Sequence, residues 1–214
     1  MNTFFYSIIL NGVLLAGGIS AAFAQMVQKS AENPVPAPAL DTVKTTFADG
    51  KLARVYTVLK GTEIREGLSI SYHPNGKVAV EAPYANGVLN GVLRTYFENG
   101  NLWQTIGYKD GDEEGVSMTY FENGKKKKKE TYKEGVLFGA VEEYSTEGKL
   151  QRRIPYENGQ VHGMAKIFDE KGAVVEEMSF DHGLRQGPYR RYKKGLMILE
   201  AKFEQNRCVE NCNF

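Results

Sequence analysis

The sequence predicts an all-β protein, an elongated and twisted antiparallel β-meander of about seven repeated hairpins, each 24 residues long. Three observations predict this fold. Glycine opens each unit, recurs nine residues later, and recurs again eleven residues after that. An aromatic residue stands three positions before the third glycine. The runs between glycines are roughly six to eight residues long, which suits strands and is too short for ordinary helices.

The repeat keeps the same frames along most of the chain. The first glycine frame contains Gly67, Gly91, Gly115, Gly139, Gly163 and Gly187. The second contains Gly76, Gly100, Gly124, Gly148 and Gly172, and the third contains Gly87, Gly111, Gly135, Gly159 and Gly183. The aromatic frame before the third glycine contains Tyr84, Tyr108, Tyr132, Tyr156 and Phe180. This regularity indicates a repeat protein.

The spacing within one unit predicts a β-hairpin. Glu98-Asn99-Gly100 is a turn signal, since Asn and Gly tolerate positive φ. A three-residue loop with the glycine in the left-handed conformation pairs Phe97 with Asn101. It then pairs Tyr96 with Leu102. Continued without interruption, this register places the even-numbered residues of both strands on one face, where most side chains of the early units are apolar or aromatic.

These spacings resemble the MORN repeat, in particular its bacterial variant found in the YwqK-type antitoxin family. The resemblance is carried by the run Tyr-Phe-Glu-Asn-Gly-Lys at 120–125, by the related runs at 96–101 and 72–77, and by ends such as Tyr156 to Gly163. It covers about residues 47–206 and implies a MORN-type repeat domain, which we expect over residues 46–214. The resemblance also implies an alternative function, in which the repeats neutralise a cognate toxin.

The N-terminal part is expected to be a signal peptide over residues 1–24. Its apolar stretch ends in Ala22-Phe23-Ala24 before Gln25, a small-x-small cleavage pattern. No Lys or Arg precedes the apolar run, so an uncleaved membrane anchor and a buried helix are the alternatives. Residues 25–45 are expected to be a proline-rich linker, because alternating prolines favour extended conformation. We therefore expect an exported protein that is periplasmic, in the outer envelope or secreted.

The net charge and the expected shape of the sheet limit the possible functions. The net charge is +1, so no global electrostatic attraction to nucleic acid is implied. A long, narrow sheet with short loops leaves no room for a deep catalytic pocket, so we expect no enzyme activity and no cofactor. The expected function is an exported scaffold that binds a protein or an anionic envelope component along its sheet.

The three histidines give no reason to expect a metal site. His73, His162 and His182 fall at different positions of the repeat and are expected to lie far apart, in or beside turns. Metal binding requires two or more such residues together with carboxylates.

The candidate binding site combines aromatic and basic residues. Strand parity predicts that Lys125, Lys127 and Lys129, from a run of five lysines, share one face. That face is also predicted to carry an aromatic cluster in which Trp103 lies opposite Thr95. The candidate residues are Phe97, Trp103, Phe121, Lys125, Lys127 and Lys129. The alternatives are a linker or N-terminal segment folded over the cluster, and lysines that are solvated and balanced by nearby glutamates.

A membrane surface is one of the anionic partners expected for the lysine run. An uncleaved N-terminus is a second route to membrane contact. The same register predicts that Glu142 lies opposite Arg152 and Lys166 opposite Glu176, with favourable charge pairing.

Three further expectations concern single residues. Cys208 and Cys212 are the only cysteines, and in an exported chain they favour a disulfide if a turn brings them together; two free thiols are the alternative. Gly124→Val is expected to cost roughly 1–2 kcal/mol, because this glycine is predicted to have positive φ. A glycine inside a strand, such as Gly107, carries no such turn penalty.

Overall fold

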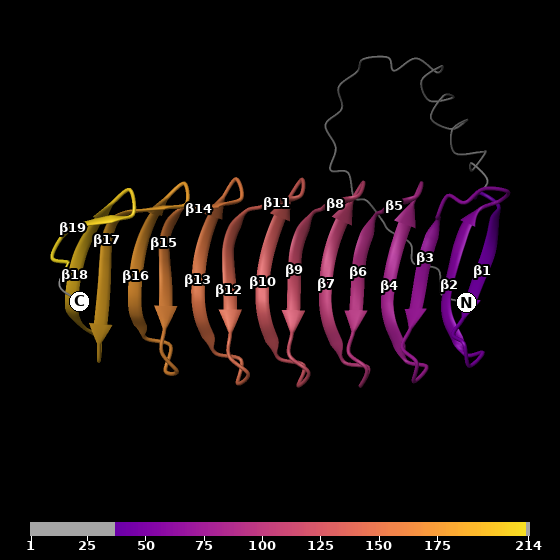
Figure 1. Cartoon of the computed structure of the whole chain (residues 1–214), viewed down its shortest axis with the longest axis horizontal. Helices are drawn as coiled ribbons and strands as arrows, with labels where there is room; N and C mark the ends of the chain where they lie inside the picture. The colour runs from indigo at the N-terminus through magenta and orange to yellow at the C-terminus, as the bar shows by residue number, and fades with distance from the viewer. Residues whose placement is uncertain (1–36, 213–214) are drawn as a thin grey trace, which may run out of the picture. The chain divides into compact units, whose positions relative to one another are not determined.

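Antiparallel hairpins follow one another along residues 37–212, the part of the chain that the computed structural model describes (Figure 1). Successive strands pair with one another, so the predicted all-β meander is confirmed. The predicted signal peptide and most of the predicted linker lie outside the described residues. Within these residues, no helix has the length and apolar character needed to cross a membrane.

Nineteen strands form one sheet. The first seven are β1 (Leu40–Thr46), β2 (Leu52–Leu59), β3 (Gly67–Tyr72), β4 (Val78–Ala85), β5 (Val88–Leu89), β6 (Gly91–Tyr96) and β7 (Leu102–Lys109). The next six are β8 (Asp112–Glu113), β9 (Gly115–Tyr120), β10 (Lys126–Lys133), β11 (Val136–Leu137), β12 (Gly139–Tyr144) and β13 (Leu150–Glu157). The last six are β14 (Gln160–Val161), β15 (Gly163–Phe168), β16 (Val174–Asp181), β17 (Leu184–Lys193), β18 (Leu196–Glu204) and β19 (Arg207–Glu210).

The sheet begins earlier than the sequence predicted. β1 pairs along its length with β2, from Leu40 opposite Leu59 to Thr46 opposite Leu52. The assignment of residues 40–45 to the linker is therefore wrong. The physical reason is that the last proline is Pro38, after which a run with three threonines and a valine can enter a ladder.

The turns have the predicted chemistry. Phe97 N donates to Asn101 O over 2.8 Å, and Gly100 N donates to Phe97 O over 2.8 Å. Gly100 has φ +92°, so the predicted left-handed glycine of the three-residue loop is confirmed. Successive hairpins are joined by two-residue turns such as Asp110-Gly111, in which both residues have positive φ.

The register beyond each loop differs from the prediction. Tyr96 pairs with Leu102 as expected, but Thr95 then pairs with Gln104, which leaves Trp103 as the extra residue of a β-bulge. The same shift occurs in the other hairpins. A bulge sets two residues opposite one, so the parity of the two strands no longer matches. The prediction that even-numbered residues of both strands share one face is therefore wrong.

One face of the sheet, called here the aromatic face, carries a row of glycine–aromatic pairs. The pairs are Gly67 with Tyr84, Gly91 with Tyr108, Gly115 with Tyr132, Gly139 with Tyr156, Gly163 with Phe180 and Gly187 with Phe203. All six glycines have positive φ, a conformation that glycine adopts more readily than other residues.

The opposite side, called here the ionic face, carries a ladder of charges across neighbouring strands. The ladder consists of Lys129, Glu142, Arg153, Lys166, Glu177, Arg190 and Glu200. Lys166 Nζ lies 3.0 Å from Glu177 Oε1, and Arg190 Nε lies 2.8 Å from Glu200 Oε1. Hydrogen bonds from Lys166 and then Tyr192 lower the pKa of Glu177 below its ordinary value.

The predicted charge pairs are displaced by one residue. Glu142 lies opposite Arg153 rather than Arg152, and Lys166 lies opposite Glu177 rather than Glu176. The bulge causes this displacement, because it shifts one strand by one residue against its neighbour. Opposite charges still face each other, since acidic and basic residues occur in adjacent pairs along these strands.

Burial is thin and concentrates near the C-terminal end. Among the described residues, the buried hydrophobic side chains are Val58, Ala82, Val141, Tyr189, Ala201 and Phe203. Tyr189, Ala201 and Phe203 pack together, and Met178 and Leu199 contact this cluster. The most continuous core therefore lies on the aromatic face over β16–β18.

Candidate functional site

A groove with a volume of about 460 Å³ runs over the aromatic face between β13 and β18. Alternation along each strand points every second side chain into it. Its apolar floor includes Ile154, Tyr156, Met178, Phe180, Tyr189 and Phe203. Charged side chains at its border include Arg152, Glu176, Arg185 and Arg191.

Two of the border arginines are paired with acids. Arg152 Nη1 lies 3.3 Å from Glu143 Oε2, and Arg191 Nε lies 3.3 Å from Glu176 Oε1. Arg191 also donates a hydrogen bond of 2.9 Å from Nη2 to the Tyr189 hydroxyl. This bond, together with the charge of Glu176, raises the pKa of Arg191 above its ordinary value. These contacts fix the direction of the guanidinium groups beside the floor.

Arg185 differs from the other two. Its guanidinium lies over the ring of Phe203, with 5.6 Å from Cζ to the ring centroid. Within residues 37–212, no carboxylate comes within 4.0 Å of this guanidinium. A cation held on an aromatic ring without an acidic partner is available to a carboxylate from outside. The arrangement suits an apolar segment that carries an acidic group.

The predicted aromatic cluster consists of two separate contacts in neighbouring turns. The rings of Phe97 and Trp103 lie 6.1 Å apart, and Trp103 is 45% exposed. In the next hairpin, Lys127 Nζ lies 5.7 Å from the centroid of Phe121. The turns are held side by side, since Asn101 Nδ2 donates to the Glu122 carbonyl over 2.7 Å. Thr95, predicted to face Trp103, faces Gln104 instead because Trp103 is the bulge residue.

The lysine run does not present three side chains on one face, so that prediction is wrong. Lys126 pairs with Tyr120 and Lys128 with Thr119, which makes Lys127 the extra residue of a bulge. Beyond the bulge, Lys129 lies on the ionic face, 4.0 Å from Glu142 Oε2.

The other lysines of the run are held locally. Lys128 forms a 2.7 Å ion pair with Glu130. Lys125 follows the turn, where its backbone N–H donates to Asn123 Oδ1 over 3.0 Å. The five lysines therefore divide between the turn and the two faces.

Cys208 and Cys212 form a disulfide with their Cα atoms 5.8 Å apart. Asn211 has φ +53°, which turns the chain between them. Cys208 lies opposite Phe203, at the edge of the buried cluster. The bond therefore links Cys212 to a residue that lies next to the groove floor.

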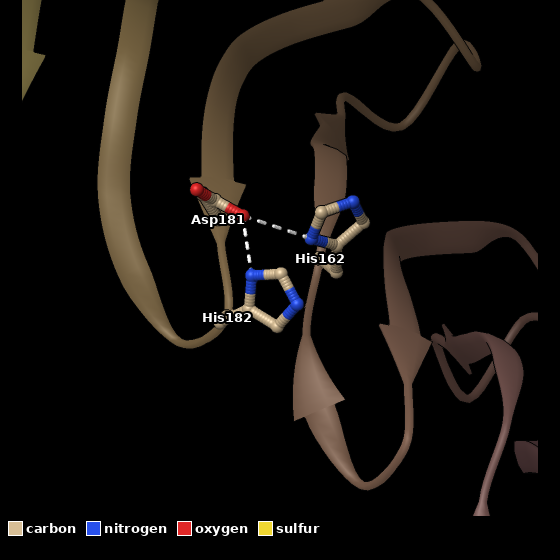
Figure 2. Close-up of side chains that lie close together, drawn as sticks. All are labelled: His162, Asp181 and His182. Atoms are coloured by element: carbon tan, nitrogen blue, oxygen red, sulfur yellow. Dashed lines mark hydrogen bonds and ion pairs between the residues drawn. The ribbon is translucent and has the colours of Figure 1, made fainter.

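The structure brings two histidines together that were predicted to lie far apart. The ring centroids of His162 and His182 are 4.8 Å apart, and one carboxylate oxygen of Asp181 contacts a nitrogen of each ring (Figure 2). The prediction was wrong because it compared positions within one repeat, whereas residues 20 apart meet at the junction between repeats.

The groove was also missed, and the sequence did contain part of its signal. The floor uses the aromatic frame at Tyr156 and Phe180, which was found. Tyr189 and Phe203 lie in the last, altered unit, where Asn206 replaces the third glycine. A register that includes the bulge would have placed all four on one face.

The comparison with family models agrees with this architecture. The MORN repeat variant model matches residues 65–86, 89–110, 113–134 and 139–158. Each matched segment contains one pair of long strands: β3 and β4, β6 and β7, β9 and β10, or β12 and β13. Among curated proteins, none matches this chain. The chain therefore contains four consecutive MORN repeats of the variant type between residues 65 and 158.

Proposed function

We propose that this protein is a non-enzymatic repeat scaffold that binds an extended segment of a partner protein in the groove of the aromatic face. The observation that carries the proposal is the apolar floor with Arg185 beside it, a cation that has no carboxylate within 4.0 Å among residues 37–212. The partner segment is apolar and carries at least one carboxylate. Burial of its apolar side chains supplies affinity, and the arginine selects the acidic group.

The single-layer sheet supports this proposal. Few side chains of the described residues are buried, so the aromatic face gains burial when a partner covers it. The groove crosses several strands, which suits an extended segment lying across them. Its border charges are already positioned by neighbouring groups, which reduces the entropy lost on binding.

The groove residues also favour binding over catalysis. The border consists of Arg152 and Arg191 in ion pairs with Glu143 and Glu176, and of Arg185 on an aromatic ring. A serine, threonine or cysteine nucleophile next to a base is one common catalytic arrangement, and the described groove lining contains none of these three residue types.

A crosslinking experiment tests the groove. A photoreactive amino acid replaces Ile167, which lines the groove and is 36% exposed. We expect a discrete crosslinked partner in cells, and Arg185→Glu should lower its yield about tenfold because the charge that meets the carboxylate is reversed. Lys194→Glu, which makes the same charge change in a nearby turn, is the matched control and should leave the yield unchanged.

The same photoreactive residue at Glu200, on the ionic face, provides the second control. Equal crosslinking from Ile167 and Glu200 would contradict a site on the aromatic face. So would a yield that is insensitive to Arg185→Glu in a variant that keeps its β-sheet circular dichroism.

The protein acts outside the cytoplasm in this proposal. Ala22-Phe23-Ala24 fits a cleavage site, and a disulfide persists in oxidising compartments. We predict a mature N-terminus at Gln25, which intact-mass measurement of the native protein will check. A cytoplasmic species that retains Met1 would contradict export.

An antitoxin role is the second candidate. It follows from the YwqK-type resemblance, and a toxin is one kind of protein that the groove would hold. Export disfavours a toxin that acts in the cytoplasm. Identification of the crosslinked partner by mass spectrometry distinguishes a toxin from an envelope protein.

A further inference from the structure

The junction between two repeats near the C-terminus gathers two histidines around one carboxylate (Figure 2). His182 Nδ1 lies 2.5 Å from Asp181 Oδ1, and His162 Nδ1 lies 3.3 Å from the same oxygen. One potential ligand atom from each residue lies within 4.8 Å of the other two. Both imidazoles thus converge on one acidic oxygen.

The repeat architecture explains why these side chains meet. Gly183 N donates to Val161 O over 2.8 Å, which places the turn after β16 against the end of β14, next to His162. The same contact recurs at other junctions, where Gly111 N donates to Leu89 O over 2.9 Å. There, Asn90 Nδ2 donates to Asp110 Oδ1 over 3.2 Å.

At two further junctions, the residue equivalent to His162 accepts a hydrogen bond from a backbone N–H. Glu66 accepts from Asn86 N over 2.7 Å, and Glu114 accepts from Glu134 N over 2.9 Å. In these three other junctions, the residues equivalent to His162 and His182 are joined by one direct hydrogen bond.

The hydrogen bonds at this junction are incomplete. His162 Nδ1 is buried and has no hydrogen-bond partner, although Asp181 Oδ1 lies 3.3 Å away, because the geometry is not that of a hydrogen bond. Its other ring nitrogen, Nε2, lies 3.6 Å from Glu157 Oε2. With the ring proton on Nε2 toward Glu157, Nδ1 carries a lone pair 3.3 Å from a carboxylate oxygen, and neither atom donates to the other. Two acceptor atoms thus lie close together, and a cation bound to both removes the repulsion between them.

We propose that His162, Asp181 and His182 form a binding site for a divalent transition-metal ion of the zinc class, with water completing the coordination. Two neutral imidazoles and a carboxylate are a ligand set that suits Zn²⁺. This site does not depend on the groove as a partner-binding site. Its ligands come from the end of β16, the turn that follows it, and the residue before β15.

The distances fit this ion after a small movement. Tetrahedral zinc with bonds of about 2.0–2.1 Å separates neighbouring ligand atoms by roughly 3.3–3.4 Å. His162 Nδ1 and Asp181 Oδ1 already have this separation, at 3.3 Å. His182 must move away from Asp181, which it can do because its side chain is 64% exposed on a turn. Glu157 would hold the His162 ring from the far side, a common support for metal-bound histidine.

Calorimetric titration with ZnCl₂ tests the site. The full protein is used without a histidine tag, after chelator treatment and with its disulfide intact so that no thiol binds the metal. We expect one zinc per chain and a higher melting temperature in its presence. Glu157→Gln should weaken zinc binding about tenfold, since it removes the charge that supports the His162 ring.

Two substitutions remove the ligands while keeping the fold. His182→Asn places asparagine where Asn86 and Asn158 adopt positive φ in the equivalent turns. His162→Asn reproduces Asn90, which occupies the corresponding junction position. The double variant should lose the single-site zinc signal and the rise in melting temperature. His73→Asn, which changes the histidine of a distant turn, is the control and should bind as the unaltered protein does.

Three results would overturn the proposal. The first is the absence of stoichiometric zinc binding to the unaltered protein. The second is binding that survives in the double variant, and the third is binding that is lost in His73→Asn.

Discussion

Replacing Phe203 by alanine is expected to lower the free energy of unfolding by about 3–5 kcal/mol. Phe203 is 5% exposed, and its ring meets that of Tyr189 edge-on with centroids 6.3 Å apart. It packs with Ala201 and borders Cys208. A sheet with so little buried surface has few other contacts that can compensate for this loss, so the C-terminal hairpins should open first.

Urea unfolding followed by circular dichroism measures the total change, and hydrogen exchange locates it. Exchange should accelerate most in β16–β18, because a repeat array transmits stability mainly between neighbours. Trp103→Ala is the matched control, since Trp103 is large but 45% exposed. Its cost should be well below that of Phe203→Ala. Equal costs would contradict a core centred on the last hairpins.

The sequence was sufficient for the repeat, the hairpins and the turns, because these depend on local backbone chemistry. Gly100 must have positive φ, and two residues are enough to close the turn at Asp110-Gly111. The sequence was not sufficient to assign residues to the two faces of the sheet. They depend on whether Trp103 is paired or forms a bulge, and no turn residue marks that choice. One inserted residue exchanges the two faces of a strand.

The prediction of the candidate site was wrong for the same reason, the assignment of residues to faces. Lys125, Lys127 and Lys129 were grouped by parity, and the bulge at Lys127 separates them. Tyr189 and Phe203 were passed over because the glycine frame breaks down in the last unit. The contact of His162 with His182 is a property of the junction between repeats, and it would follow from comparing residues 20 apart.

The last prediction also concerns a junction between repeats. Gly107→Ala is expected to cost about 2–3 kcal/mol, in the range of overpacked sites. As expected for a strand residue, Gly107 does not have positive φ. An added Cβ would nevertheless overlap the carbonyl oxygen of Glu114, which belongs to the backbone and cannot rotate away as a side chain would. The Glu114 N–H also donates to Gly107 O over 2.8 Å, which holds the two residues together.

The equivalent position in the next repeat indicates how large the cost of Gly107→Ala should be. Thr131 occupies the equivalent position one repeat later, and Phe138 N donates to its carbonyl over 2.8 Å. The junction at Thr131 therefore accommodates a side chain. We expect Gly107→Ala to strain its own junction, by moving the Glu114 peptide, without unfolding the array.

Urea unfolding of three variants distinguishes the causes. Gly124→Ala should cost roughly 1–2 kcal/mol from its φ of +80° alone, since an added Cβ there meets nothing within 4 Å. Thr131→Ala should cost less than either glycine variant, because a Cβ is already accommodated at that junction. If Gly107→Ala proves as mild as Thr131→Ala, the Glu114 carbonyl yields readily and the close approach at this junction places no constraint on the sequence. If its cost exceeds that of Gly124→Ala, the fixed backbone contact between repeats outweighs the conformational strain of a turn.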